Sequence, residues 1–197
     1  MILKEKEADS LALLVESLRL PAEKAIPMLE AAVKYAGNNL SASEYLSYLY
    51  LEVGKPKKCL DLCNNMLEQL EDSPEASKLS VHISNNKAAA LNTLGRYSES
   101  ISILEKCLEY ASKDIYFKNL GDAYFSIGIY EKAAFNYEKA VALNSEMDEA
   151  YYNLAVCLFL QGYFNECKLN VQRALRANPK VTEYAELLKE VAAKAQF

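Results

Sequence analysis

Apolar and polar residues recur along most of this chain with the period of an α-helix. In the segment 131–141, small and aromatic residues fall at spacings of three and four, and Glu-Lys pairs fall between them. This spacing places the apolar side chains on one stripe and the charges on the other side, as in a helix that packs on one face. No segment shows sustained strand-like alternation bounded by turn residues. The pattern predicts an all-α chain.

The helical pattern itself repeats along the chain. Gly162 follows Gly128 at the same interval at which Leu154 follows Leu120, and Gly95 precedes Gly128 at nearly that interval. The interval is about 34 residues, which is typical of stacked helical hairpins in which a glycine permits the tight turn between the two helices. The chain divides into five predicted repeats, of which the first is the most degenerate: 6–39, 40–73, 81–113, 114–147 and 148–181.

Two segments lie outside these repeats. Residues 182–197 predict a last helix with a charged outer side, which suits the end of a repeat array. We interpret residues 74–80 as an extension of the following helix, because Pro74 and Glu75 suit a first helical turn; a long loop is the alternative. In the first repeat, Pro27 lies within the second helix, which therefore either starts there or is kinked there.

The repeats resemble the tetratricopeptide repeat (TPR) family, whose signature has an aromatic residue, a Leu-Gly pair, a Tyr and later small residues. Two consecutive repeats carry it: Phe117, Leu120, Gly121, Tyr124, Ala133, Tyr137 and Ala140, then Tyr151, Leu154, Ala155, Leu158, Cys167, Val171, Ala174 and Pro179. The resemblance covers nearly the whole chain. It implies one domain over residues 1–197, a right-handed superhelical solenoid of about five antiparallel hairpins with a C-terminal capping helix. The first helix of each hairpin would line a concave groove.

Groove positions inferred from the resemblance include an asparagine in three successive repeats, Asn86, Asn119 and Asn153. An amide carries both donor and acceptor, so it can pair with a peptide N–H and C=O together. We interpret these residues as an asparagine ladder that resembles those of O-GlcNAc transferase and armadillo-repeat import receptors; Asn85 belongs to the same surface. The alternatives are that the amides are solvated or that they bond to a neighbouring helix.

Aromatic and apolar residues flank the predicted ladder. Exposed apolar surface marks binding sites, and tyrosine supplies rigid contact area with a polar tip. We therefore predict an extended or amphipathic peptide ligand with apolar anchors. Phe159 has an alternative, since it could pack against the last helix. The flanking candidates are Tyr45, Tyr48, Phe125, Tyr152, Val156 and Phe159.

Composition excludes several function classes. The 197 residues are 51% hydrophobic and 25% charged, which is too apolar for a mainly disordered chain. A net charge of -5 argues against nucleic-acid binding by bulk electrostatics, and no apolar run is long enough to cross a bilayer. One histidine and five cysteines within helical patterns indicate neither a metal centre nor a disulfide framework. We predict a cytoplasmic protein that is not an enzyme and has no cofactor.

The sequence also argues against one TPR binding mode. The carboxylate clamp that holds the Glu-Glu-Val-Asp tails of chaperones needs Lys and Arg, and none is present at the matching positions. The prediction is a scaffold or adaptor that binds a partner peptide or helix. Alternatives are a homo-oligomeric structural protein, and a secretion-chaperone-like or regulatory subunit of a larger complex. The clamp positions hold Asn85, Ala89, Asn119, Glu149 and Asn153.

Overall fold

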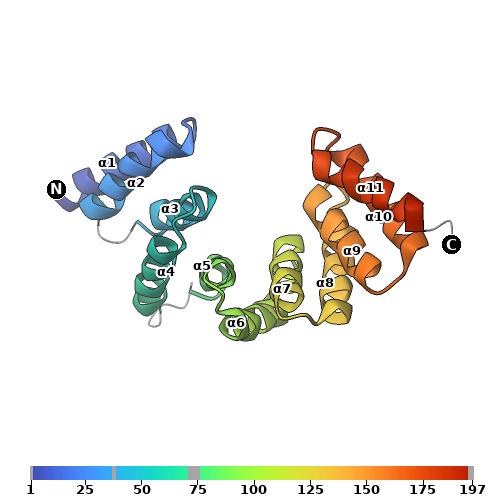
Figure 1. The fold of residues 1–197 in the computed structure, drawn as a ribbon. Coiled ribbons are helices and arrows are strands. Elements are labelled where there is room, and N and C mark those ends of the chain that lie inside the picture. The colour runs from blue at the N-terminus through green and yellow to red at the C-terminus, as the bar shows by residue number, and fades with distance from the viewer. Residues whose placement is uncertain (1, 37–38, 71–75, 195–197) are drawn as a thin grey trace. The chain divides into compact units, whose positions relative to one another are not determined.

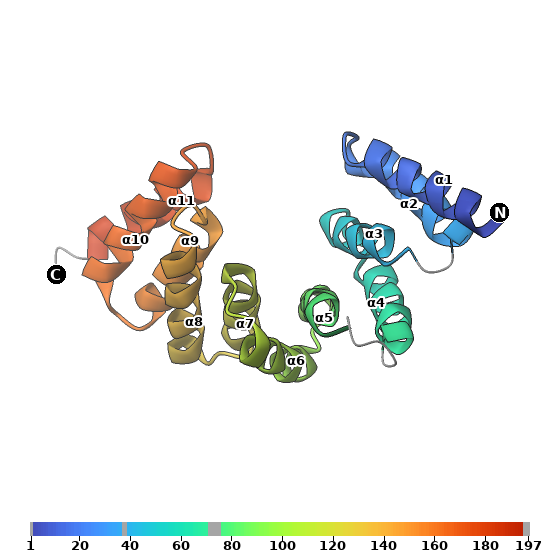
Figure 2. The ribbon, with the colours of Figure 1, turned by 180° about the vertical axis from the view of Figure 1, so that it is seen from behind.

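A computed structural model describes residues 2–36, 39–70 and 76–194 (Figures 1 and 2). Within those ranges the secondary structure is entirely helical, which confirms the predicted all-α class. The helices are α1 (Ile2–Ser17), α2 (Ala22–Ala36), α3 (Leu40–Glu52), α4 (Pro56–Leu70), α5 (Ala76–Thr93), α6 (Tyr97–Tyr110), α7 (Asp114–Ser126), α8 (Tyr130–Leu143), α9 (Asp148–Leu160), α10 (Phe164–Ala177) and α11 (Thr182–Lys194).

The chain divides into two compact units, Met1–Arg96 and Tyr97–Phe197, and each is described by itself. In the first unit, α1 pairs with α2 and α3 pairs with α4; in the second, α7 pairs with α8 and α9 pairs with α10. In the first unit α2 also packs against α3 and α4 against α5; in the second, α6 packs against α7, α8 against α9 and α10 against α11. Short connections place such neighbours antiparallel. Each unit is therefore built from stacked helical hairpins.

Glycines make the tight turns that the sequence predicts. Gly128 and Gly162 have φ angles of +79° and +84°, in the left-handed region where a side chain is strained. In the second of these turns, the backbone N–H of Tyr163 donates to the carbonyl of Leu158 at 2.9 Å and closes the end of α9. The next helix begins at Phe164. The turn therefore reverses the chain within three residues.

Two local predictions about helix ends can be compared with the structure. Helix α2 begins at Ala22, so the option that this helix starts at Pro27 is wrong. Helix α5 begins at Ala76, so residues 76–80 extend the helix as interpreted, whereas residues 74 and 75 lie outside the described residues. The exposed position of Pro27 is consistent with its place on the outer side of α2.

The same side-chain contact joins two successive helices in each unit. In the first unit, the hydroxyl of Tyr50 donates to Glu30 Oε1 at 2.7 Å, and the ammonium of Lys58 lies 5.2 Å from the Tyr50 ring centre. Tyr50 lies on α3 and Glu30 on the preceding α2, so the bond sets the register between hairpins. The contact recurs in the second unit with Tyr124, Glu105 and Lys132, at 2.8 Å and 5.0 Å.

The last helix, α11, closes one end of the second unit. It buries Tyr184 and Val191 against Val171 and Ala174 of α10. The hydroxyl of Tyr184 donates to Asp148 Oδ2 at 2.9 Å. Its outer side stays charged, as a terminal helix of a repeat array requires. The exposed residues of this side are Glu183, Glu186, Lys189, Glu190 and Lys194.

Candidate partner-binding surface

An aromatic pair on α3 reaches the surface of the first unit. The rings of Tyr45 and Tyr48 stack with their centres 6.4 Å apart, and 47% of Tyr48 is exposed. Partial burial raises the pKa of Tyr48 above its ordinary value, and the carboxylate of Glu52 raises it further. The phenol therefore stays neutral and can donate a hydrogen bond throughout the physiological range.

Polar contacts join α5 to α3 beside this pair. The side-chain amide of Asn86 donates to Ser47 Oγ at 2.9 Å, and Ser47 is fully buried. Nδ1 of His82 lies 3.4 Å from Glu44 Oε1. Because both contacts run from α5 to α3, the donor of Asn86 is engaged in holding α5 against α3.

The second unit contains a polar network centred on Asp122. Its Oδ1 accepts a hydrogen bond from the Tyr137 hydroxyl at 2.8 Å and another from the amide of Asn153 at 3.2 Å. Its Oδ2 lies 3.1 Å from the ammonium of Lys118. That ammonium also lies 3.2 Å from Glu149 Oε2. The network therefore joins α7, α8 and α9.

The charges within this network satisfy one another. Burial alone would lower the pKa of Lys118, but the nearby carboxylates of Asp122 and Glu149 outweigh it and raise the pKa. Burial also raises the pKa of Tyr137 far above its ordinary value, and the charge of Asp122 adds to this. Lys118 is consequently an ammonium with two carboxylate partners, and Tyr137 is a neutral donor.

The predicted ladder residues occupy buried or bonded positions. Asn86 and Asn153 both form hydrogen bonds between neighbouring hairpins, which is one of the alternatives that the sequence leaves open. Asn85 and Asn119 are buried, with 6% and 7% of their surfaces exposed. Asn86 lies in the first unit and Asn119 and Asn153 in the second. A continuous ladder along the whole chain stays a prediction.

The predicted aromatic residues of the second unit pack within that unit. The ring of Phe125 lies 5.5 Å from that of Tyr130, and Tyr152 lies 4.8 Å from Tyr184 of α11. Because of its contact with Tyr184, Tyr152 forms part of the packing of the last helix and is only partly available to a partner. The remaining candidate of this group, Val156, is half-buried on α9.

Phe159 follows its alternative interpretation. It packs against the core formed with α11, and the ammonium of Lys194, at the end of that helix, lies 4.6 Å from its ring centre. Its ring also meets Phe164 edge-on at 5.7 Å. The ring of Phe159 accordingly helps to hold the last helix in place.

Sequence reasoning missed Lys118, Asp122 and Tyr137 as a unit. A signal was present, because Lys118 and Asp122 are four residues apart on one face of a helix, where opposite charges attract. The contribution of Tyr137 had no such local signal, because it comes from the next helix. Among the described residues, no group of three or more His, Cys, Asp or Glu side chains is placed to hold a metal ion. No helix in the described ranges combines the length and apolarity needed to span a bilayer.

Comparison with known families finds tetratricopeptide repeats between residues 81 and 181. A tetratricopeptide repeat model matches residues 81–114 and 148–181, and a TPR repeat model matches residues 121–162. A TPR repeat-containing protein of Methanocaldococcus jannaschii is 26% identical over 76 residues, which cover 39% of this chain and 13% of the relative. Human RNA polymerase II-associated protein 3 is 24% identical over 162 residues, which cover 78% of this chain and 24% of that protein. The chain thus spans about a quarter or less of the length of these relatives.

Solved structures show the same fold. The pilF protein of Pseudomonas aeruginosa superposes with a TM-score of 0.76 at 17% identity, covering 98% of this chain and 86% of that one. A thermophilic TPR protein of Thermus thermophilus gives 0.70 at 18% identity, covering 93% and 99%. The first TPR domain of Spaghetti (RPAP3), bound to the HSP90 peptide SRMEEVD, gives 0.57 at 22% identity, covering 59% and 94%. With its repeat matches and its stacked hairpins, the chain belongs to the tetratricopeptide repeat family.

Proposed function

We propose that this chain is a non-catalytic interaction module that binds a segment of a partner protein. The binding surface is formed by the exposed face of the first helix of a repeat, such as α3. TPR-fold proteins generally mediate protein–protein interactions. The observation that carries the proposal here is Tyr48, which is 47% exposed on a helix whose Leu46, Leu49 and Tyr50 are buried. Stacking on Tyr45 holds its ring in place, so little conformational entropy is lost when a partner covers it.

The predicted site residues then divide into two roles. Buried residues, and residues with hydrogen bonds or ring contacts to neighbouring helices, shape the surface, and the others contact the partner. The shaping residues are Asn85, Asn86, Asn119, Asn153, Phe125, Tyr152 and Phe159, and the contacting residues are Tyr45, Tyr48 and Val156.

The chemistry of the surface disfavours an acidic peptide tail. Lys118 lies 3.2 Å from Glu149, which occupies one of the positions of a carboxylate clamp, and it also contacts Asp122. A terminal carboxylate there would have to displace one of these partners and would lie beside the other, at an electrostatic cost. We therefore propose an apolar or aromatic anchor in the partner rather than a tail such as the SRMEEVD peptide bound by the RPAP3 domain.

The proposal includes a cytoplasmic location. All five cysteines are free thiols and all are buried. Free thiols persist in reducing compartments. The buried thiols act as small apolar side chains within the helix packing.

The test is a quantitative capture experiment with matched variants. Immobilised wild-type chain, Tyr48→Ala and Tyr110→Ala are compared by mass spectrometry of the proteins that they retain. Tyr110 is the control because it is a tyrosine that is 73% exposed at the end of α6 in the second unit. We expect partners that are retained by wild type and Tyr110→Ala and lost with Tyr48→Ala. If every retained protein binds Tyr48→Ala equally well, the surface around Tyr48 is not the binding site.

A further inference from the structure

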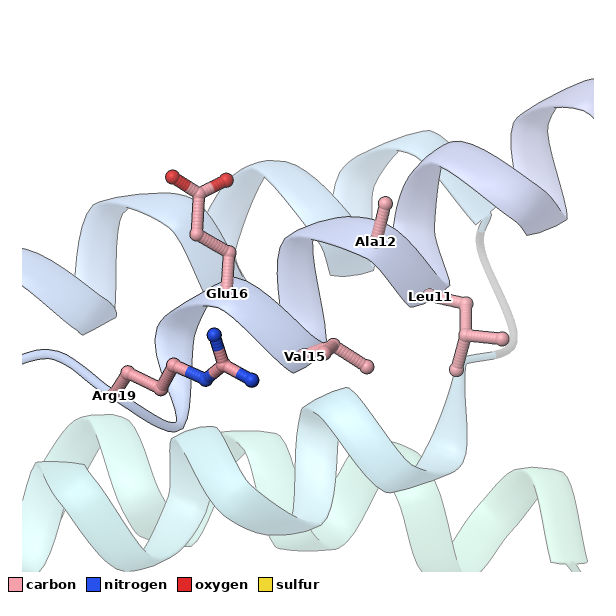
Figure 3. Close-up of a pocket in the computed structure, with 5 residues that line it drawn as sticks. All are labelled: Leu11, Ala12, Val15, Glu16 and Arg19. Carbon is pink, nitrogen blue, oxygen red and sulfur yellow. The ribbon is translucent and has the colours of Figure 1, made fainter.

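Helix α1 and the residue that follows it expose an apolar stripe that no described residue covers. Leu11, Val15 and Leu18 follow one another at spacings of four and three, and 51–58% of each is exposed. They project from one side of the helix, as Figure 3 shows for Leu11 and Val15. Glu16 and Arg19 lie along one edge of the stripe and, with Leu11, Val15 and Ala12, line a hollow of about 530 Å³. Neither charge forms an ion pair with a described residue.

A cleft in the second unit has an apolar lining with charged residues among it. It lies between α6 and α8 with α7 as its floor, and its volume is about 500 Å³. Phe135 of α8 is 56% exposed at this cleft. The apolar residues that line the cleft are Leu108, Phe117, Leu120, Tyr124 and Phe135, and the charged ones are Glu105, Glu131 and Lys132.

The first unit has a corresponding cleft that lacks the exposed phenylalanine. It lies over Tyr50 between α2 and α4, and it is smaller, at about 340 Å³. Asp61 lines this smaller cleft and occupies the same position in its repeat, which begins at Leu40, as Phe135 does in the repeat that begins at Asp114. Of these two clefts, only that of the second unit therefore pairs the shared Tyr–Glu–Lys contact with an exposed aromatic side chain. An exposed phenylalanine beside an apolar cleft is a typical seat for an amphipathic helix.

We propose that α1 of one copy of this chain docks into the α6–α8 cleft of a second copy. The stripe of Leu11, Val15 and Leu18 supplies apolar residues on one helix face, which is the pattern a helix-binding groove receives. The charges also match, because the stripe edge carries one acid and one base and so does the start of α8. Arg19 can pair with Glu131, and Glu16 with Lys132. The same chain thus supplies both halves of the interface.

Because the two surfaces differ, the contact is head-to-tail. Each copy that docks its α1 still presents a free cleft, and each copy whose cleft is filled still presents a free α1. Contacts of this kind form rings or open chains rather than closed two-fold dimers. The interface is small, so the association is expected to be reversible and to depend on protein concentration.

The experiment blocks one half of the interface at a time. Val15→Glu removes the stripe, Phe135→Glu removes the cleft, and the molar mass is measured by sedimentation over a series of concentrations. Wild type should exceed the mass of a dimer as its concentration rises, and each variant alone should stay monomeric. An equimolar mixture of the two variants should form dimers and nothing larger, since one intact stripe and one intact cleft remain.

Leu169→Glu is the matched control, because Leu169 occupies the position on α10 that Phe135 occupies on α8 and is 47% exposed. It should assemble like wild type. Circular dichroism and thermal unfolding verify that all variants fold, as expected for exposed positions. A wild type that stays monomeric at every concentration overturns the proposal, and so does a mixture that stays monomeric. Dimerisation of Phe135→Glu alone would overturn it too, because α1 would then pair with another surface. Tyr48 belongs to neither surface, so the capture experiment stands or fails separately.

Discussion

The ring of Tyr137 lies directly against the backbone of Gly121. A β-carbon on residue 121 would stand 2.7 Å from Cε1 of the tyrosine, closer than atoms of real side chains approach. The ring has no room to retreat, because only 1% of Tyr137 is exposed and its hydroxyl is bonded to Asp122. Helices α7 and α8 therefore meet at a distance that only glycine permits.

Gly121→Ala should destabilise the protein by about 1–3 kcal/mol, the usual range for overpacking. This loss should appear although alanine favours a helix by about 1 kcal/mol relative to glycine. Urea unfolding followed by circular dichroism measures it. Tyr137→Val provides the partner variant, because the next repeat combines Ala155 with Val171 at the equivalent positions. In that background Gly121→Ala should cost little, and an unchanged cost would show that the clash lies elsewhere.

Asn153→Ala should lower the free energy of unfolding by about 1 kcal/mol, because it removes the hydrogen bond to Asp122 between two hairpins. Asp122→Ala should cost more, since it also leaves the hydroxyl of Tyr137 and the ammonium of Lys118 without that partner. Chemical unfolding curves of both variants test this order. Asn165→Ala, an exposed asparagine on α10, is the control and should behave like wild type. Equal stability of Asn153→Ala and wild type would contradict the structural role.

The recurrent contact between successive helices predicts two similar losses. Tyr50→Phe and Tyr124→Phe each remove a hydroxyl that bonds to a glutamate of the preceding helix, and each should cost about 1 kcal/mol. The two residues lie in different units, so the losses should add in the double variant. Thermal and urea unfolding measure the sum, with the exposed Tyr110→Phe as control. If Tyr110→Phe lowered the free energy of unfolding by the same amount, the losses in Tyr50→Phe and Tyr124→Phe could not be assigned to their hydrogen bonds.

The peptide SRMEEVD should not bind this chain measurably. Lys118 is held by Asp122 and Glu149, so it is already engaged and would have to give up one of these carboxylates to pair with an acidic tail. Fluorescence anisotropy of the labelled peptide tests this, and the RPAP3 domain that binds the peptide is the positive control. Saturable binding that weakens with added salt would show that a clamp forms after all.

Stability should fall when the pH rises above about 9. Burial raises the pKa of the Cys107 and Cys167 thiols to about 11, and that of Cys157 to about 12. In the unfolded chain these thiols lose their protons near their ordinary value of 9.0. The folded state therefore retains protons that the unfolded state has released, and its advantage decreases between pH 9 and 11. Urea midpoints at pH 8, 9 and 10 measure the decrease.

Cys107→Ala combined with Cys167→Ala supplies the comparison for the alkaline effect. Without these two thiols, the urea midpoint should change less between pH 8 and 10. The comparison concerns the slope with pH, because the substitutions also alter the packing at every pH. An identical slope in wild type and the variant would assign the alkaline loss to other groups.

Local conformation and the helical pattern are properties that nearby residues decide. The repeated glycines predict the turns correctly, because a positive φ is a requirement of one residue and its two neighbours. The helices follow from apolar spacing within about a dozen residues. The sequence alone did not decide whether α2 begins before Pro27. A helix tolerates proline in its first turn, so the answer depends on where the helix begins.

The sequence by itself determined the all-α class, the interval of the hairpins and the membership of a repeat family, since these depend on short-range patterns that recur. Only the tertiary structure decided what the polar and aromatic residues do. An asparagine amide pairs equally well with a peptide or with a neighbouring helix, and Asn153 finds Asp122, 31 residues earlier, only when the hairpins stack. Likewise, Phe159 is surface or core according to whether α11 covers it. Partners of this kind are chosen by packing between distant segments, which local spacing does not encode.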